Sequence, residues 1–185
     1  MQETTKREEQ RKEQREVEGI TIKNKWSGDI IFQSTKTTWK EAVEEAVENC
    51  DNLHDANLSG VDLSGADLYE ADFFDANLLY ADLSDANLYY ANLGGADLGG
   101  ANLNGADLCY ANLYKGNLCG ADLRGADLYR ARLYETYLYG ANLSGANLSE
   151  TNLQNVKFYG EGGTTKLTKK QLPEFLNALG IEVVS

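Results

Sequence analysis

The sequence predicts an all-β solenoid with a short helical cap at each end. Three observations lead to this fold class: a five-residue repeat that runs without insertion over residues 51–160, a leucine at the third position of nearly every repeat, and an amphipathic segment with a helix-start signal on each side of the repeat. The repeated segment spans 110 of the 185 residues, which at five residues each makes 22 repeats. The repeat therefore decides the architecture, and the flanking segments are expected to close its ends.

A five-residue period fits neither of the regular elements. In an α-helix, successive leucines would lie about 140° apart around the axis, so no face would collect them. In a flat strand, an odd step sends successive leucines to opposite faces. Leucine is the one large apolar residue that recurs in the repeat, replaced only by Phe73 and Phe158, so the leucines must share one interior. The chain is therefore expected to wind around an axis, with the first and third residues inward and the last two turning the corner.

Most repeats read alanine, then aspartate or asparagine, then leucine, followed by two variable residues, as in Ala56–Gly60 and Ala101–Gly105. This A(D/N)LXX pattern resembles the signature of the pentapeptide-repeat family, and its 22 tandem copies make the resemblance specific. The resemblance implies a right-handed quadrilateral β-helix, the pentapeptide-repeat fold, with four pentapeptides in each coil. Residues 20 apart would then stack in columns along the shaft.

The N-terminal flank carries strand and helix signals. Thr38 and Glu41 form a capping box before an apolar stripe, so a helix is expected over residues 39–49. Upstream, Ile20–Ile22 and Ile30–Phe32 are expected to be strands that extend the edge of the first coil.

The C-terminal flank carries a second helix. Thr168 and Gln171 form another capping box, and Phe158 is expected to plug the last coil beneath the helix that follows. The apolar stripe of that helix is predicted at Leu172, Phe175, Leu176 and Leu179. The chain is thus expected to divide into a charged tail or frayed helix at 1–18, an N-terminal cap of strands and a helix at 19–50, the repeat β-helix at 51–160, and a C-terminal helical cap at 161–185.

Composition excludes several classes of function. A formal net charge of −12 repels nucleic acid and anionic lipid, so neither direct nucleic-acid binding nor membrane association is expected. His54 is the only histidine, and the sequence has no catalytic triad, metal-ligand spacing or phosphate loop. The sequence therefore predicts a protein that is not an enzyme and that holds no cofactor and no metal. Cys50, Cys109 and Cys119 match no zinc spacing and indicate free thiols in a reducing, cytoplasmic compartment.

Two surfaces emerge when residues 20 apart are grouped into columns. Two adjacent columns on one side of the coil collect aromatic rings, and rigid tyrosine side chains serve well at protein interfaces. Stacked tyrosines also stabilise a solenoid by themselves, so a purely structural role stays open. The candidate interaction face consists of Tyr69, Tyr89, Tyr90, Tyr110 and Tyr129. A candidate acidic face, whose carboxylates could imitate nucleic-acid phosphates, consists of Asp62, Asp67, Asp82, Asp107, Asp122 and Asp127.

The leading hypothesis is a non-catalytic rigid scaffold for protein–protein interaction, with an unknown protein partner. The family resemblance adds an alternative, because some members protect DNA gyrase by resembling DNA: this chain would then be a DNA-mimicking modulator of a type II topoisomerase such as gyrase. A third hypothesis is glycan or polymer binding on the tyrosine face. The oligomeric state stays open, including a dimer formed through a terminal cap.

Overall fold

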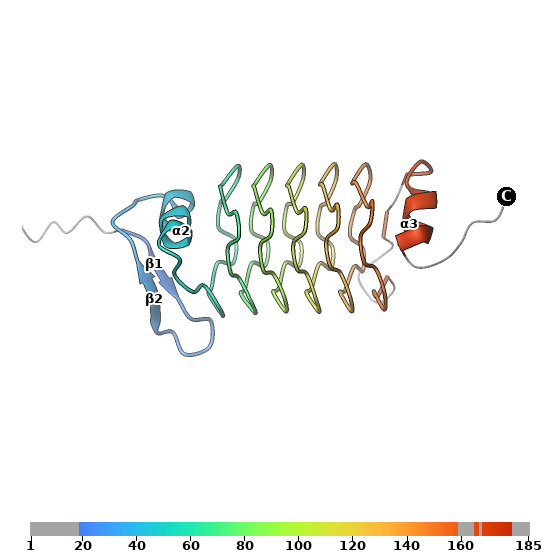
Figure 1. The fold of residues 1–185 in the computed structure, drawn as a ribbon. Coiled ribbons are helices and arrows are strands. Elements are labelled where there is room, and N and C mark those ends of the chain that lie inside the picture. Colours follow the sequence, from blue (N-terminus) through green and yellow to red (C-terminus); the bar gives the residue numbers. More distant parts are fainter. Residues whose placement is uncertain (1–18, 159–164, 167, 179–185) are drawn as a thin grey trace, which may run out of the picture.

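The computed structural model describes residues 19–158, 165–166 and 168–178. Within them the chain forms a stack of coils, with a hairpin and a helix at one end and a single helix at the other (Figure 1). The predicted charged tail at 1–18 lies outside the described residues. The elements at the two ends are β1 (Thr21–Lys23), β2 (Ile30–Gln33), α2 (Trp39–Glu48) and α3 (Leu172–Ala178).

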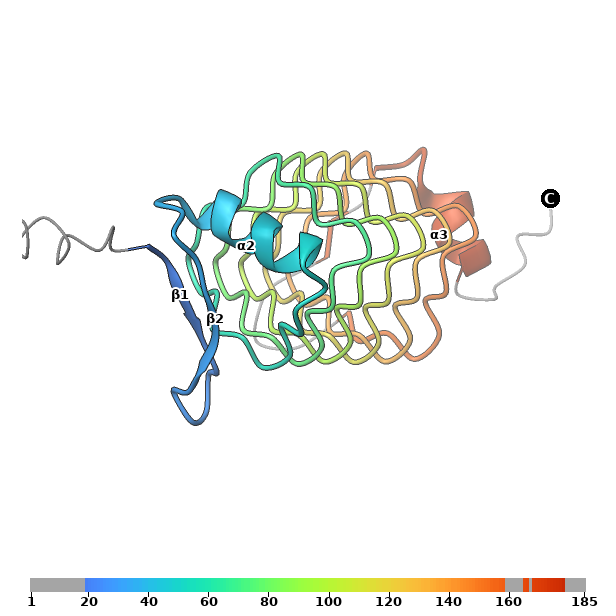
Figure 2. The same ribbon diagram turned by 60° about the vertical axis from the view of Figure 1, so that its left-hand side comes forward.

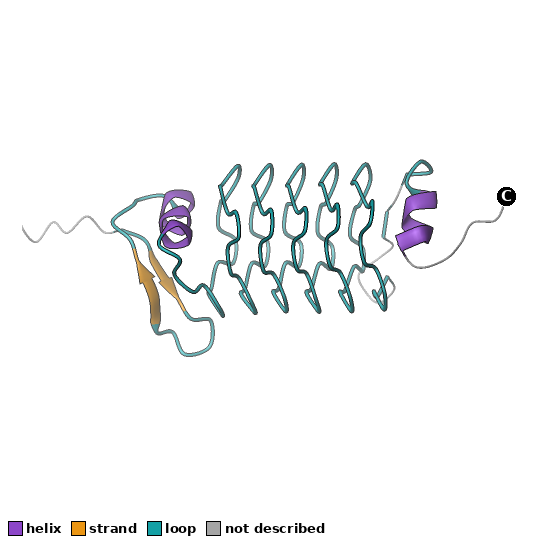
Figure 3. Cartoon of the chain, in the orientation of Figure 1, coloured by secondary structure: helices purple, strands orange, loops and turns teal. Residues whose placement is uncertain are grey.

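Each coil of the stack holds 20 residues. Parallel bridges join second-position residues one coil apart, such as Asn57 and Asn77. The backbone of Asn77 is typical of the pattern, since its N–H donates to Ala56 O and its carbonyl accepts from Leu58 N, both at 2.8 Å. Four pentapeptides therefore make one coil. The coils carry single bridges rather than longer strands, and Figure 3 draws them as loop, because each straight segment lasts only three residues before the next turn.

The first and third residues of the repeats point into the stack. Every third-position leucine from Leu53 to Leu153 is fully buried, as is Phe73. The first-position residues from Ala56 to Thr151 are buried too. The leucines thus share one interior, as the five-residue period predicts. Alanine suits the other inward position because little room remains for a side chain next to a corner.

The corner of each repeat constrains its second and fifth residues. The fifth residue has a left-handed backbone, with φ between 54° and 60° where it is not glycine. Glycine takes this conformation without strain, which explains its frequency there. The aspartate or asparagine at the second position closes the turn with its side chain, as when Asp107 Oδ1 accepts a hydrogen bond of 2.9 Å from Cys109 N.

The N-terminal end joins the first coil through backbone hydrogen bonds. β1 and β2 pair antiparallel. The strand β1 begins and ends one residue later than the sequence predicts. The hairpin is joined to the repeat by a backbone hydrogen bond in which Lys25 N donates to Asp55 O at 2.7 Å. α2 begins after its N-cap Thr38, which accepts from Glu41 N, and ends at Glu48. The capping-box prediction is therefore correct, and the helix is one residue shorter than expected. Figure 2 shows the hairpin and α2 together at this end of the stack.

α2 packs one apolar face against the stack. Three side chains of this face, Ala42, Val43 and Ala46, are fully buried. Trp39 and Val47 are partly buried against the same core. These residues recur at helical spacing, so the amphipathic pattern of the sequence places the helix correctly. The apolar face of α2 thereby joins the same hydrophobic core as the leucines of the repeat.

At the C-terminal end, one glutamine makes three hydrogen bonds with the last coils. Gln171 is buried, and its Nε2 donates to Leu143 O at 2.5 Å and to Ala146 O at 2.8 Å. Its Oε1 accepts from Gly145 N at 2.9 Å and from Thr168 N at 2.8 Å. The predicted Thr168–Gln171 pairing therefore exists, and the glutamine also satisfies backbone groups that no further coil can reach.

The helix α3 follows that glutamine. Its Phe175 ring lies 5.1 Å from the ring of Phe158, in an edge-to-face arrangement, which agrees with the prediction that Phe158 lies beneath this helix. The predicted apolar stripe is wrong at Leu172, which is 50% exposed at the first position of α3. The contacts of Gln171 set the orientation of this first turn, and they leave Leu172 on the outside. Leu179, the last residue of the predicted stripe, lies outside the described residues.

Candidate interaction surface

Five tyrosines from two adjacent columns on one side of the stack form a continuous row of ring contacts, which we call the tyrosine ladder. They are Tyr69, Tyr89, Tyr90, Tyr110 and Tyr129, the residues of the predicted interaction face. The rings of Tyr69 and Tyr89 are stacked, with their centroids 6.0 Å apart. The rings of Tyr89 and Tyr90 meet edge to face, with their centroids 4.8 Å apart. Tyr90 stacks on Tyr110 at 4.8 Å, and Tyr110 meets Tyr129 edge to face at 5.7 Å. The structure thus brings all five residues together.

An arginine from the chain itself occupies the C-terminal end of the ladder. The guanidinium carbon of Arg130 lies 5.1 Å from the ring centroid of Tyr129 and 5.7 Å from that of Tyr110. Its Nε donates to Glu150 Oε2 at 2.6 Å, and its Nη1 donates to the Tyr110 hydroxyl at 3.2 Å. The Tyr129 hydroxyl completes the group by donating to Glu150 Oε1 at 3.2 Å.

The charge of this arginine alters the neighbouring carboxylate. The hydrogen bond from Arg130 holds the pKa of Glu150 below its ordinary value, so Glu150 stays ionised. We call Arg130, Glu150 and the two rings of Tyr110 and Tyr129 the arginine clamp. The 20-residue spacing puts these residues on one side of the coil, but the ion pair and the ring contacts depend on side-chain conformations that a repeat pattern does not specify.

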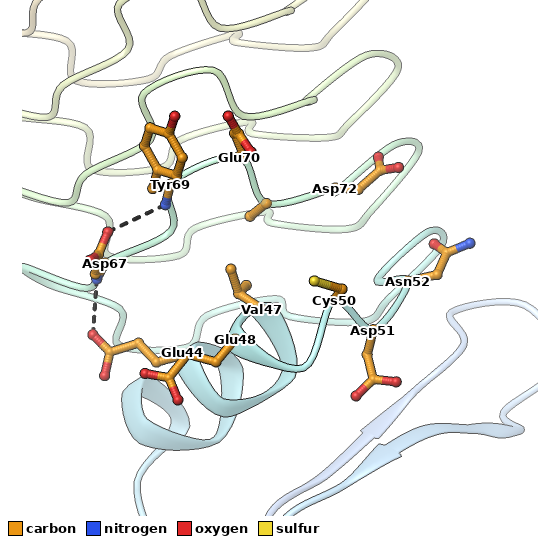
Figure 4. Close-up of a pocket in the computed structure, with 11 residues that line it drawn as sticks. Glu44, Val47, Glu48, Cys50, Asp51, Asn52, Asp67, Tyr69, Glu70 and Asp72 are labelled. Atoms are coloured by element: carbon orange, nitrogen blue, oxygen red, sulfur yellow. Dashed lines mark hydrogen bonds between the residues drawn. The ribbon is translucent and has the colours of Figure 1, made fainter.

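The N-terminal end of the ladder borders an acidic hollow of about 740 Å³ between α2 and the first coils (Figure 4). Val47 and Cys50 lie on its α2 side, and Tyr69 lies at its opposite wall. Its lining includes six carboxylates and neither lysine nor arginine. The six carboxylates belong to Glu44, Glu48, Asp51, Asp67, Glu70 and Asp72.

Two of these carboxylates have partners that fix the shape of the hollow. Glu44 Oε1 accepts from Asp67 N at 2.9 Å and thereby ties α2 to the coil. Asp72 Oδ2 lies 2.6 Å from Nε2 of His54. Glu70 instead lies beside Tyr69 (Figure 4), and the interaction with this neighbouring carboxylate is the main cause of a raised pKa of Tyr69. The sequence does not predict the hollow, since the hollow joins residues of a helix and of coils whose packing the repeat does not determine.

The predicted acidic face is largely engaged in the turns of the repeat. Asp62 Oδ1 accepts from Ser64 N at 3.0 Å, and this backbone bond is the main cause of a lowered pKa of Asp62. Asp122 pairs with Arg124, whose Nη2 lies 2.6 Å from Asp122 Oδ2. The other four carboxylates accept in the same way from the backbone two residues later, and they belong to Asp67, Asp82, Asp107 and Asp127. Each of the six therefore has a structural role in addition to its charge.

The three cysteines are free thiols in three different environments. Cys50 is exposed, Cys119 is intermediate and Cys109 is buried. Burial is the main cause that raises the pKa of Cys109 well above its ordinary value. Among the described residues, no group of three His, Cys, Asp or Glu side chains is arranged to hold a metal ion, and none of the described helices is long and apolar enough to cross a membrane.

These environments predict a strong difference in thiol reactivity. In the folded protein at pH 8, Cys50 is expected to react with iodoacetamide at least about tenfold faster than Cys109, because the reactive species is the exposed thiolate. Mass spectrometry of tryptic peptides from timed reactions measures both rates. In 8 M urea the difference should disappear, and equal rates in the folded protein would contradict the buried position of Cys109.

No disulfide between Cys109 and Cys119 is expected after oxidation, because they lie in different columns.

Comparisons with known proteins bear on the fold and the family. The family profile described as pentapeptide repeats matches residues 52–88, 86–125 and 126–160. The chain is similar to a solved structure of a pentapeptide repeat protein, Rfr23, from the cyanobacterium Cyanothece 51142, with 29% identity, coverage of 66% of this chain and 96% of that chain, and a TM-score of 0.62. A search of curated proteins returned no match.

Two further solved structures are similar to the chain at lower TM-scores. One is alr5209, a pentapeptide repeat protein from Nostoc Pcc 7120, with 36% identity, coverage of 55% of this chain and 84% of that chain, and a TM-score of 0.42. The other is QnrB1, a plasmid-mediated fluoroquinolone resistance protein, with 21% identity, coverage of 70% of this chain and 85% of that chain, and a TM-score of 0.28. Because the family profile covers more than half of the chain, this protein belongs to the pentapeptide-repeat family.

Proposed function

We propose that this protein is a non-catalytic scaffold that binds a partner protein through the tyrosine ladder. The observation that carries the proposal is the continuous row of ring contacts that joins five tyrosines on the surface of a rigid stack. Tyr69 is 46% exposed and Tyr90 is 48% exposed, so the row offers ring surface that a partner could cover. Aromatic anchors of this kind dominate the binding energy of protein interfaces.

Backbone conformation supports a role beyond packing for two of these tyrosines. Tyr90 and Tyr110 occupy the fifth position of their repeats, with φ of 60°. A bulky residue in this left-handed region costs about 1 kcal/mol relative to glycine, which other repeats place there. Glycine at either position would avoid this backbone cost. The two rings therefore fit a surface that is kept for binding.

The proposed scaffold has the architecture of its family. We infer that residues 51–160 form a right-handed quadrilateral β-helix, that 19–50 and 161–185 act as caps at its ends, and that 1–18 form a charged tail. The 20-residue stacking supports the four-sided coil, and the contacts of α2 and Gln171 with the end coils support the caps. The free thiols fit a cytoplasmic location.

DNA mimicry is the second candidate function. It draws support from the stacking of acidic residues, since the bridged pairs Asp62–Asp82 and Asp107–Asp127 put carboxylates directly above one another. Against it, the carboxylates of the acidic face are engaged in turns, and Arg124 neutralises one of them. Inhibition of gyrase supercoiling by the purified protein, lost when these aspartates become asparagine, would favour this candidate over the scaffold.

Changing Tyr89, Tyr90 and Tyr110 to serine tests the scaffold. Capture of the partner from an extract of the native cell, followed by measurement of its affinity for the purified protein, should show a loss of at least about 2 kcal/mol, or thirtyfold. The leucine interior is untouched, so the variant should keep a cooperative unfolding transition.

A second set of tyrosines supplies a matched control. Tyr114 and Tyr134 stack at 5.7 Å in another column, and Tyr139 lies in a third. Changing these three to serine removes the same number of rings, but affinity should stay within about twofold of the parent. A folded ladder variant that binds as tightly as the parent would leave the tyrosine ladder a structural feature only and would overturn the proposal.

A further inference from the structure

We propose that the N-terminal end of the tyrosine ladder, where Tyr69, Tyr89 and Tyr90 meet Glu70 and the acidic hollow, receives an arginine side chain from a basic segment of the partner protein. The inference rests on the proposed function and specifies the chemistry of the partner. It starts from the two ends of the ladder, which carry similar groups but differ in one respect.

Both ends of the ladder have a glutamate next to a tyrosine. At the C-terminal end, the Tyr129 hydroxyl donates to Glu150, and Arg130 binds the same carboxylate. At the N-terminal end, Glu70 lies beside Tyr69, and both line the acidic hollow (Figure 4). Among the described residues, no lysine, arginine or histidine forms an ion pair with Glu70. The N-terminal end therefore has the rings and the carboxylate of the arginine clamp without its cation.

The surface around Glu70 has the charge to attract such a cation. Glu70 is one of six carboxylates in the acidic hollow, and no lysine or arginine lines it. In Figure 4, Glu70 and Tyr69 lie side by side at its upper wall, across from the acidic side chains of α2. Wall carboxylates of like charge raise the local concentration of cationic groups and steer them toward the ladder. A segment with two or more basic residues could place one on the ladder and the next in the hollow.

Arginine fits this surface better than other cations. A guanidinium is planar, so it can stack on a tyrosine ring while its N–H groups bind a carboxylate, and Arg130 does both in this chain. Lysine offers a point charge without the planar contact. A metal ion fits poorly, because a hollow of about 740 Å³ is far larger than one ion and no described group of ligands converges in it.

A synthetic peptide of sequence Gly-Arg-Gly-Arg-Gly, blocked at both ends, probes this site on the full chain. Isothermal titration at low salt is expected to detect binding of this peptide. Replacing its arginines by lysine should weaken binding several-fold, and replacing them by citrulline, which keeps the shape and loses the charge, should weaken it at least about tenfold. Equal binding of the arginine and citrulline peptides, or no binding of the arginine peptide at 1 mM, would overturn the proposal.

Two matched variants locate the site. Glu70→Gln should weaken binding of the arginine peptide about tenfold, because it removes the carboxylate and keeps the size of the side chain. Glu150→Gln removes the corresponding carboxylate at the other end, where Arg130 already occupies the rings, and should change affinity less than about twofold. Equal effects of the two substitutions would contradict a specific site at Glu70. Both variants should show the far-ultraviolet circular dichroism of the parent.

The results separate this inference from the proposed function. If the triple-serine variant loses the partner but the peptide does not bind, the ladder is an interface and the inference about arginine is wrong. If the triple-serine variant keeps the partner while Glu70→Gln weakens the peptide, the proposed function is wrong and the arginine site exists on its own.

Discussion

Replacing Leu103 by alanine is expected to lower the free energy of unfolding by about 2–5 kcal/mol. Leu103 is fully buried in the middle of the stack, in the same column as the fully buried Leu83 and Leu123. Removing its branched end leaves a cavity that coils on both sides line, and backbone bonds to both neighbouring coils limit how far the chain can collapse into it. Urea unfolding of the parent and the variant, analysed with a common slope, measures the difference.

The adjacent residue provides the control for this substitution. Asn104 lies on the outside, where its side chain donates to Arg124 O at 2.8 Å. Changing Asn104 to alanine removes that one exposed hydrogen bond, so the expected loss is about 1 kcal/mol or less. Equal losses at the two positions would contradict an interior lined by third-position leucines.

Replacing Gln171 by glutamate is expected to destabilise the C-terminal end by about 3–5 kcal/mol at neutral pH. The substitution keeps the shape of the side chain but exchanges an N–H donor group for an oxygen. That oxygen would face the carbonyls of Leu143 and Ala146, which now accept from Nε2. The site is also buried, so an ionised carboxylate there would lose its hydration.

The pH dependence of this variant has a definite sign. Burial and the two carbonyls would raise the pKa of the introduced carboxyl in the folded state above its value in the unfolded chain. Its neutral form can donate to one carbonyl, so the destabilisation should shrink as the pH falls toward 4 and should be complete above the raised pKa. Hydrogen exchange at Gly145 N, which donates to Gln171 Oε1, reports opening of this end.

A neighbouring residue separates the glutamine contacts from a general effect of charge. Leu172 follows Gln171 in the chain and is half exposed, so its replacement by glutamate should change stability by less than about 1 kcal/mol. If both substitutions to glutamate have the same small effect, Gln171 does not hold the last coils, and the inference that residues 161–185 act as a cap loses its main support.

Much of the fold follows from the sequence because the repeat constrains it at every step. The five-residue period requires a shared interior for the leucines, and the 20-residue coil then puts the five tyrosines into contact. Thr38 marks the start of α2 correctly, because N-capping depends on residues three apart in the chain. These features are local, or they repeat with the period, so one sequence is enough to predict them.

The features that the sequence did not predict depend on contacts between unlike elements. Glu44 and Glu48 border the ladder only because α2 packs on the first coils in one orientation. Leu172 is exposed because the contacts of Gln171, and not the apolar pattern, orient the start of α3. The arginine clamp forms because the Arg130 side chain lies over the rings of Tyr110 and Tyr129 rather than pointing into solvent, and the repeat pattern does not determine that conformation.

The stacking of residues 20 apart has a consequence for how such a chain can change its length. A duplication or loss of 20 residues adds or removes one whole coil, and every later side chain stays in its own column. A duplication or loss of five residues preserves the leucine interior equally well, yet it moves every later side chain to the neighbouring column. Loss of residues 96–100 would keep alanines and leucines inside while it separated Tyr110 and Tyr129 from Tyr89 and Tyr90. A binding surface on this stack is therefore preserved only when the chain gains or loses whole coils of 20 residues. The interior, in contrast, is also preserved when the chain gains or loses a single five-residue repeat.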